Sequence, residues 1–329
     1  MIKSVLIANR GEIAIRIART ARRMGIKTYV VRTAKEPEAV YLSAADAVIN
    51  FPETDGNIPE FLDIDRLVGL AREYKIDSLH PGYGYLSENA ELAERCRDNG
   101  IVFIGPSPEV IRLMGDKVAA KGIAAQSGVP MLGASQGAVH TLDEARKIAK
   151  RLGYPVIIKA VSGGGGRGMR IVHHQDELEQ LYKIATAEAQ VAFNDPSVFI
   201  EKYLENPKHI EFQIVADNYG NVVHLGEREC SIQRKHQKLM EEAPSPALDE
   251  RLRKKMAAAA VSLAKQAGYQ SLGTVEFLLD HQKHFYFMEM NTRIQVEHPV
   301  TEEITGIDLV ELQFNIAAGR KLPLRQSQI

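Results

Sequence analysis

The chain has 329 residues with 41 basic and 42 acidic side chains, so its formal net charge is −1. This balance excludes a global field that would attract nucleic acid or an anionic membrane, and any bound anion must be held by a local cluster. Its composition, 45% hydrophobic and 25% charged, is typical of a globular protein, and its length suggests two or three subdomains. The two cysteines, Cys96 and Cys230, do not have the spacing of a metal site. No apolar run is long enough to span a membrane. The N-terminus enters a predicted strand directly, which leaves no room for a signal or transit peptide. We therefore expect a cytoplasmic protein with no nucleic-acid or membrane partner.

The first part of the chain alternates short apolar runs with amphipathic segments, which predicts a parallel sheet with right-handed crossovers. The predicted elements are strands at 4–8, 27–31, 78–80 and 102–105 and helices at 12–24, 63–74 and 89–99. Residues 106–130 form a predicted helical connector.

The remainder has an α+β pattern. The predicted helices are 143–152, 176–193, 249–267 and 308–318, and the predicted strands are 154–160, 169–173, 197–204, 209–216, 221–228, 274–279 and 284–290. A turn at 217–220 indicates that the strands around it are antiparallel.

A tract of four glycines, 163–166, lies between two predicted strands. A strand and not a helix follows it, and Lys159 precedes it, which excludes a dinucleotide fingerprint and a Walker A loop. Glycine N–H groups can approach phosphate oxygens with no Cβ in the way, and Lys159 would add an ammonium group. A surface loop is the alternative, but the conformational entropy cost of four glycines favours a phosphate-binding flap.

Two acidic residues, Glu276 and Glu289, lie on neighbouring predicted strands. If residues 282 and 283 form a two-residue loop, these side chains are directly opposite, with Cβ atoms roughly 5 Å apart. Two facing carboxylates, which we expect to be buried, require a cation, and hard oxygen ligands favour Mg²⁺, with Asn291 adding a further oxygen. A surface pair that forms salt bridges with lysines is the alternative.

Two polar stretches add candidate residues. Between 287 and 299 an apolar strand gives way to Asn291, Arg293 and Glu297, which suggests a metal, a polyanion and an acid–base step in one place. Within 227–238, His236 and Lys238 share a face if the chain is extended, and either an anion pocket or a solvated loop fits. For the turn-rich loop 80–88, structural and ligand-binding interpretations are equally favoured.

Several segments together resemble the biotin carboxylases of the ATP-grasp superfamily. They are residues 7–14, 80–88, 113–117, 158–160 with the glycine tract, 201–207, 233–242 and 289–299. The resemblance implies a fold of class α/β and α+β: a Rossmann-like N-terminal domain (1–105), a helical connector (106–130), and an ATP-grasp domain with a glycine-flap lid subdomain (131–204) and a catalytic body (205–329).

The resemblance also implies residue roles around ATP and Mg²⁺ (or Mn²⁺). The nucleotide would be bound by Lys117, Lys159, Gly164, Gly165, Gly166, Glu201, Lys202, Leu204, His209, Gln233 and His236. Glu276, Glu289 and Asn291 would carry the metal, and Lys238, Arg293, Gln295 and the Val296 N–H would hold bicarbonate. Glu297 would be the general base, with Lys238 and Arg293 as the other catalytic residues.

The implied reaction is the attack of bicarbonate on the γ-phosphoryl group of MgATP, which gives carboxyphosphate and then carboxylated biotin on a carrier protein. The implied partners are the biotin carboxyl carrier protein and carboxyltransferase, in a homodimeric enzyme of the acetyl-CoA carboxylase type. The alternatives are another ATP-grasp ligase that uses an acyl or carboxyphosphate intermediate, or a truncated ATP-binding fragment. The family continues into a C-terminal segment with an arginine for the biotin enolate, and this chain ends at Ile329. We therefore expect a truncated chain that forms very little carboxybiotin alone.

Overall fold

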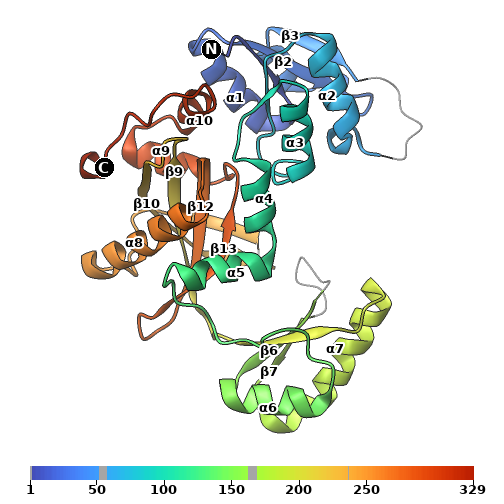
Figure 1. Cartoon of the computed structure of the whole chain (residues 1–329), viewed down its shortest axis with the longest axis vertical. Helices are drawn as coiled ribbons and strands as arrows, with labels where there is room; N and C mark the ends of the chain where they lie inside the picture. Colours follow the sequence, from blue (N-terminus) through green and yellow to red (C-terminus); the bar gives the residue numbers. More distant parts are fainter. Residues whose placement is uncertain (1, 52–57, 162–168, 236) are drawn as a thin grey trace.

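Three β-sheets lie along the length of the molecule in a computed structural model that describes residues 2–51, 58–161, 169–235 and 237–329 (Figure 1). The N-terminal sheet lies at one end, the small sheet of the lid at the other, and the sheet of the body between them. The predicted fold class is confirmed, whereas the domain boundaries at 105, 130 and 204 remain predictions. No helix among the described residues is both long and apolar enough to cross a membrane.

The N-terminal sheet is parallel, with the strand order β3-β2-β1-β4-β5. Its elements are β1 Ser4–Ile7, α1 Gly11–Arg23, β2 Lys27–Arg32, η1 Val40–Ala44, β3 Ala47–Asn50, η2 Glu60–Leu62, α2 Ile64–Glu73, β4 Ser78–His80, α3 Ala90–Asp98 and β5 Val102–Phe103. Strand β3 was not predicted, because it is an edge strand in which only Ile49 is buried and no apolar run marks it.

The connector consists of α4 Pro108–Gly115 and α5 Lys117–Gln126. The side chain of Asp116 accepts hydrogen bonds from the N–H groups of Val118 and Ala119, so it caps α5 and fixes where this helix starts. Both helices pack against the strand β13 Phe285–Asn291, which places the start of α5 close to the candidate site.

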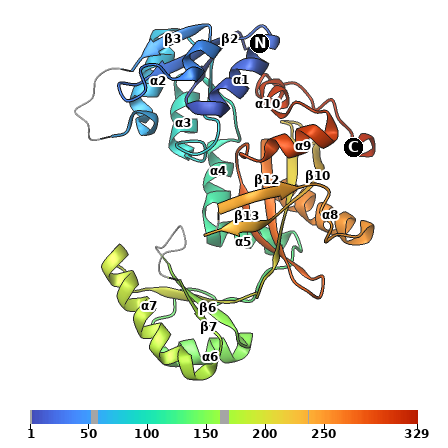
Figure 2. The same cartoon turned by 180° about the vertical axis from the view of Figure 1, so that it is seen from behind.

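The lid is an antiparallel sheet of order β7-β6-β8 with its own hydrophobic core. Its elements are α6 Leu142–Leu152, β6 Val156–Ala160, β7 Met169–Val172, η3 Gln175–Glu177, α7 Leu178–Phe193 and β8 Val198–Lys202. In both views α6 lies on the side of the lid sheet that faces away from the body (Figure 2). The ends of β6 and β8 therefore remain available to the space between the lid and the body.

The body is an antiparallel sheet of order β11-β10-β9-β12-β13. Its elements are β9 Lys208–Ala216, β10 Val222–Arg234, β11 Gln237–Glu242, α8 Glu250–Gln266, β12 Ser271–Leu279, β13, α9 His298–Thr305, α10 Leu309–Ala317 and η4 Gln326–Gln328. Strand β10 extends through the polar stretch as far as Arg234 and pairs with β11, and neither this pairing nor α9 was predicted. No apolar pattern marks either element, since β11 has no buried residue and α9 buries only His298 and Thr301.

The facing of Glu276 and Glu289 is confirmed, but the loop that produces it was predicted wrongly. The Asp280 N–H bonds to the His284 carbonyl, which leaves three residues, 281–283, in the loop. That loop alone would place Met288 opposite Glu276, but a β-bulge between the pairs Phe277–Phe287 and Glu276–Glu289 restores the register. Two compensating irregularities therefore give the pairing that a regular two-residue hairpin would give.

The N-terminal unit and the body share one hydrophobic core, which runs from β1 and α1 to β9, β12 and α10. Asp308 joins them by accepting hydrogen bonds from the Thr20 hydroxyl at 2.7 Å and from Arg16 at 3.0 Å. Burial raises the pKa of Asp308, but the bonds from Thr20, the Glu311 N–H and Arg16 outweigh it and lower the pKa to about 2.

We predict that Asp308→Ala lowers the free energy of unfolding by about 1–3 kcal/mol at pH 7, because it removes the carboxylate that bonds Arg16 and Thr20 and leaves the partly buried Arg16 with Glu302 as its remaining acidic partner. A depressed pKa contributes stability that is present above the ordinary value of 3.8 and lost as the pH falls through about 2. Urea unfolding at pH 7 and near pH 3 should therefore show the difference between variant and wild type shrinking at the lower pH. Glu311→Ala, at a more exposed carboxylate of the same cluster, is the control and should cost less than about 1 kcal/mol.

Candidate functional site

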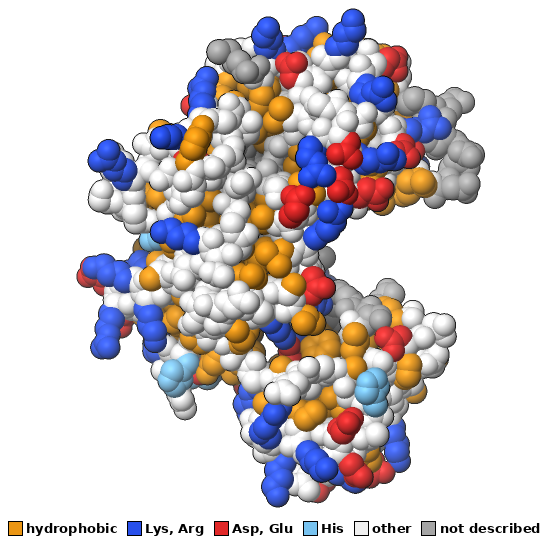
Figure 3. Space-filling view, viewed as in Figure 1, with side chains coloured by type: hydrophobic (Ala, Val, Ile, Leu, Met, Phe, Trp, Pro, Cys, Tyr) orange, Lys and Arg blue, Asp and Glu red, His pale blue; other side chains and the backbone are white. Residues whose placement is uncertain are grey.

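The candidate site lies where the surface is hollowed between the lid and the rest of the chain (Figure 3). The lid contributes residues of β6 and β8, the body contributes one face of its sheet, and α5 contributes its first turn. The body's share is a cluster of charged and amide side chains that are almost entirely buried, which is unusual for a packed sheet.

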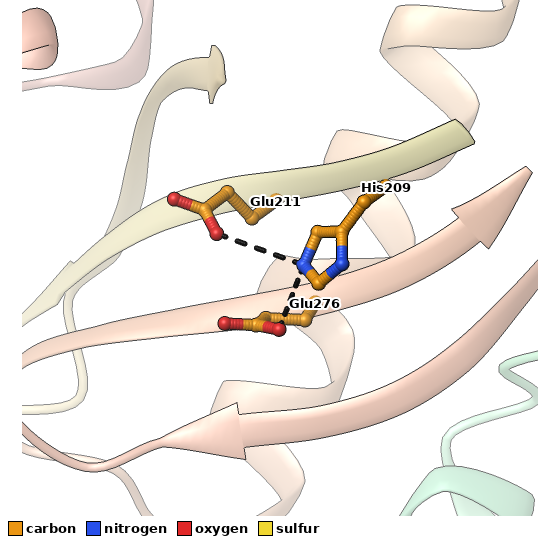
Figure 4. A group of neighbouring side chains, drawn as sticks. All are labelled: His209, Glu211 and Glu276. Atoms are coloured by element: carbon orange, nitrogen blue, oxygen red, sulfur yellow. Dashed lines mark ion pairs between the residues drawn. The ribbon is translucent and has the colours of Figure 1, made fainter. Parts of the chain in front are cut away.

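The carboxylate of Glu276 contacts several members of this cluster, and the His209 ring lies between it and Glu211 (Figure 4). Its Oε2 lies 2.7 Å from the Nε2 of His209, and its Oε1 accepts from Lys238 at 3.0 Å, Asn291 at 2.7 Å and Gln295 at 2.9 Å. Burial raises the pKa of Glu276, but His209 and Lys238 outweigh this and hold the pKa far below its ordinary value. The side chain is therefore an ionised centre around which the other groups are arranged.

Lys238 binds three carboxylates at once. Its Nζ lies 2.5 Å from Glu211, 2.6 Å from Glu297 and 3.0 Å from Glu276. Burial alone would lower the pKa of Lys238, but these three charges raise it well above the ordinary value. Burial alone would raise the pKa of Glu297, but the charge of Lys238 outweighs burial and lowers this pKa below its ordinary value. Both members of the Lys238–Glu297 pair are therefore charged at neutral pH.

Sequence reasoning missed Glu211 and Arg228, which are both fully buried and joined by a 2.7 Å ion pair. Glu211 lies two residues after His209 on β9, so strand alternation could have placed it on the same face. Arg228 could not have been placed this way. A bulge in β10 near Gly226, whose φ is +86°, shifts the pairing by one residue and brings Arg228 opposite Glu211.

The burial that we predicted for the Glu289 carboxylate is wrong. Its side chain is exposed and not buried, and it lies on β13, the edge strand of the body sheet. It has no hydrogen-bond or ion-pair partner among the residues that the structure describes. Desolvation by the surrounding protein raises the pKa of Glu289, Glu276 and Glu88 raise it further, and His209 and Lys117 oppose the rise. Lys117, exposed at the start of α5, is thus close to Glu289.

The segment after β13 is held from both sides. Arg293 donates to Glu88 at 2.9 Å and to the Asn291 oxygen at 3.0 Å, and the Thr292 N–H donates to the same Glu88. Glu88 is a third residue whose role sequence reasoning missed, and it shows that the loop 80–88 supports the site. Val296 is 60% exposed, and its N–H has no acceptor within the described part of the chain. It is therefore free to donate to an anion.

The lid carries a second charged group. Glu201 accepts from both Lys159 and Lys121, and both ammonium groups lie over the ring of Phe199, at 5.9 and 5.8 Å from its centroid. Burial raises the pKa of Glu201, and Lys159 and Lys121 lower it below the ordinary value. Lys121 is a further residue that sequence reasoning missed. Two lysines aimed at one carboxylate are also positioned to meet an anionic ligand.

Other predicted nucleotide residues fall into three groups. The Lys202 N–H donates to the Gly133 carbonyl at 2.8 Å, so it is not free for a ligand, while Leu204 is half-buried just beyond the end of β8. Gln233 lies 3.2 Å from the Nδ1 of His209 and so belongs to the body cluster. Gly164, Gly165, Gly166 and His236 lie outside the described residues.

The charges of the body cluster suit a divalent cation. Among the described residues, the carboxylates of Glu211, Glu276, Glu289 and Glu297 outnumber the fixed cations of Lys238 and Arg228, and Arg293 is paired with Glu88. One spatial group of possible ligands is His209, Glu211 and Glu276, and another is Glu211, Cys230 and Glu297. Glu211 is already shared by Arg228 and Lys238, whereas Glu289 has no described partner. Of these described carboxylates, Glu289 is therefore the most available to a metal, and Glu276 faces it across the two strands.

Comparison with known proteins identifies the family. Residues 1–111 match the family described as biotin carboxylase, N-terminal domain, and residues 116–325 match that described as carbamoyl-phosphate synthase L chain, ATP binding domain. A biotin carboxylase of Nostoc sp. is 54% identical over 99% of this chain, which spans 72% of that protein. The chain belongs to the biotin carboxylase family.

Two further matches place the family in context. Human mitochondrial pyruvate carboxylase is 48% identical over the whole chain, which spans 28% of that larger protein. The biotin carboxylase domain dimer of Hydrogenobacter thermophilus 2-oxoglutarate carboxylase, solved with MgADP, ADP and bicarbonate, superposes with a TM-score of 0.91 at 48% identity, covering all of this chain and 72% of that one. The predicted family is confirmed, and a nucleotide, magnesium and bicarbonate are the ligands bound by that relative.

We predict that Glu289→Gln raises the melting temperature of the metal-free protein at pH 7.5 and not near pH 4.5. The raised pKa means that the charged form is disfavoured in the folded state, so the penalty exists only above the ordinary value of 4.5 and is lost as the pH falls. The same variant should lose Mn²⁺ binding, measured by electron paramagnetic resonance, while the exposed control Glu311→Gln keeps it. Unchanged Mn²⁺ affinity in Glu289→Gln would remove this residue from the metal site.

Proposed function

We propose that this chain carries out the ATP- and bicarbonate-dependent carboxylation of biotin through a carboxyphosphate intermediate. The observation that carries the proposal is the ionised Lys238–Glu297 pair, which lies beside Glu276 and whose glutamate belongs to the same segment as Arg293. It combines a cationic group for a small anion with a carboxylate base, both in a largely dry pocket. ATP, Mg²⁺ or Mn²⁺, bicarbonate and carrier-bound biotin are the proposed ligands.

Bicarbonate would be held between Lys238, Arg293 and the free N–H of Val296. Glu297 is the proposed base, because its lowered pKa keeps it deprotonated and able to accept the bicarbonate proton. Such phosphoryl transfer depends on alignment and charge neutralisation more than on covalent participation by the protein. A divalent cation at Glu276 and Glu289, with Asn291 beside them, would neutralise phosphate charge when bound. The Gln295 side chain is already engaged on both ends, so a direct role as a bicarbonate ligand would require it to release a partner.

ATP would bind between the lid and the body. The lysines at Glu201, Lys159 above all, would exchange a carboxylate for phosphate oxygens, and Lys117 would approach from α5. The residues of the glycine tract, Gly164 to Gly166, and His236 keep their proposed nucleotide roles on sequence grounds. The division into an N-terminal domain, connector, lid and body is part of the proposal, and the separate cores of the lid and the body support it.

A biotin carboxyl carrier protein and a carboxyltransferase are the proposed partners, in a homodimer of the acetyl-CoA carboxylase type. The dimeric relative from Hydrogenobacter supports the homodimer. The relatives include proteins named chloroplastic and mitochondrial, and we propose the cytoplasm as the location of this chain.

The proposal predicts that bicarbonate increases ATP hydrolysis by the chain at saturating Mg²⁺ by at least about tenfold, because the γ-phosphoryl acceptor is bicarbonate and not water. Release of phosphate is measured with and without added bicarbonate in degassed buffer. Hydrolysis at the same rate without bicarbonate would instead favour another ATP-grasp ligase. Transfer of ¹⁴C from bicarbonate to biotin, in the same mixture, tests whether the chain forms carboxybiotin.

We predict that Arg293→Ala raises the KM for bicarbonate by about 10–100-fold and leaves the KM for ATP within about threefold, because one charge-assisted anion contact is lost. Steady-state phosphate release measures both constants. Arg97→Ala, at an exposed arginine on α3, is the matched control and should leave both constants unchanged. A rise confined to the KM for ATP would place Arg293 on the nucleotide.

A further inference from the structure

Arg228 is the largest fully buried side chain among the described residues, so a ligand cannot reach it directly. A buried guanidinium is costly unless all its donors are satisfied. Here it is satisfied by five side-chain oxygens: those of Glu211 (2.7 Å), Gln213 (2.8 Å), Thr301 (2.7 Å), Gln295 (2.7 Å) and Thr274 (3.4 Å).

The contact with Gln295 determines which way that amide points. The Gln295 Oε1 accepts from Arg228, and its Nε2 donates to Glu276 at 2.9 Å. A reversed amide would place NH₂ against the guanidinium and oxygen against the carboxylate, so both contacts would become repulsive. Arg228 and Glu276 therefore allow one orientation only.

The contact with Glu211 extends the influence of Arg228 to the other side of the pocket. One carboxylate oxygen of Glu211 accepts from the Nε of Arg228, and the other lies 2.5 Å from Lys238. Glu211 is thereby held as a bridge between a cation that no ligand touches and the cation proposed to bind bicarbonate.

We propose that Arg228 is a positioning residue for the bicarbonate pocket, acting through the Gln295 amide on one side and through Glu211 and Lys238 on the other. The kinetic part of this inference depends on the proposed function, whereas the structural part does not. A purely structural arginine would affect stability when replaced, but it would leave the geometry of the pocket and the affinity for bicarbonate unchanged.

The kinetic test compares Arg228→Lys with Arg16→Lys. Both keep the charge and remove a guanidinium that bonds several side chains, but Arg16 bonds Thr20, Glu302 and Asp308 at the junction of α1 with α9 and α10, away from the pocket. Arg228→Lys should raise the KM for bicarbonate by about tenfold or more and leave the KM for ATP within about twofold, because a single ammonium group cannot reach both Gln295 and the opposite partners. Arg16→Lys should lower the melting temperature without changing either constant. Equal bicarbonate constants in the two variants would overturn the proposal.

The second test needs no catalysis. The protein is labelled with ¹⁵N at glutamine side chains, and the Gln295 amide signal is identified by its absence in Gln295→Met. In Arg228→Lys this signal should shift and exchange its protons with solvent faster, and in Arg16→Lys it should stay unchanged. If Arg228→Lys does not fold, Thr301→Val removes one anchor of Arg228 and should shift the signal less, in the same direction. An unshifted Gln295 signal would overturn the positioning role of Arg228, even if bicarbonate-dependent ATP hydrolysis is intact. A shifted signal in a chain that lacks this hydrolysis would reject the proposed function and leave the positioning role standing.

Discussion

The buried contact of Lys238 with Glu211, Glu276 and Glu297 is the interaction on which the site depends. Three carboxylates of this kind would repel one another in a low-dielectric pocket, and one ammonium group at 2.5–3.0 Å from all of them makes their burial possible. The compensation is incomplete, because Glu289 adds a further carboxylate with no described partner. A pocket built in this way has an excess of negative charge beside cations that can receive an anion. That combination suits a metal-bound polyphosphate and a small oxyanion at the same time.

The body sheet is built to hold these charges rigidly. His209 and Glu211 come from β9, Arg228 from β10, Lys238 from β11 and Glu276 from β12, so four hydrogen-bonded strands bring the cluster together with the segment after β13. On the opposite face the same strands bury Phe212, Val275 and Phe277 in a hydrophobic core with α8. One face of the sheet therefore provides stability, and the other can hold charged groups that would not contribute much stability by themselves.

The sequence was most informative where a local pattern decides the structure. The parallel N-terminal sheet follows from apolar runs separated by amphipathic helices, and the exact bounds of β4 show how reliable such a run can be. The predicted facing of Glu276 and Glu289 was right, but the loop that produces it has three residues and depends on the bulge near Met288. Arg228 was out of reach for a related reason. The bulge at Gly226 moves the pairing of β10 with β9 by one residue, and the spacing of polar and apolar side chains does not reveal such a shift.

The segment from Phe287 to Glu297 shows why a strand can end in charged residues without losing stability. Its apolar half belongs to the core of the body, and its polar half is secured by groups from elsewhere: Glu88 holds Arg293, Arg228 holds Gln295, and Lys238 holds Glu297. Each of these supports comes from a different part of the chain, the first from the N-terminal unit. All three supports hold the proposed bicarbonate side, and the proposed metal side, Glu289 and Asn291, directly precedes it in sequence. Glu276 joins them, because its carboxylate bonds Asn291 on one side and Gln295 on the other, so a change in charge at either side is felt by the other.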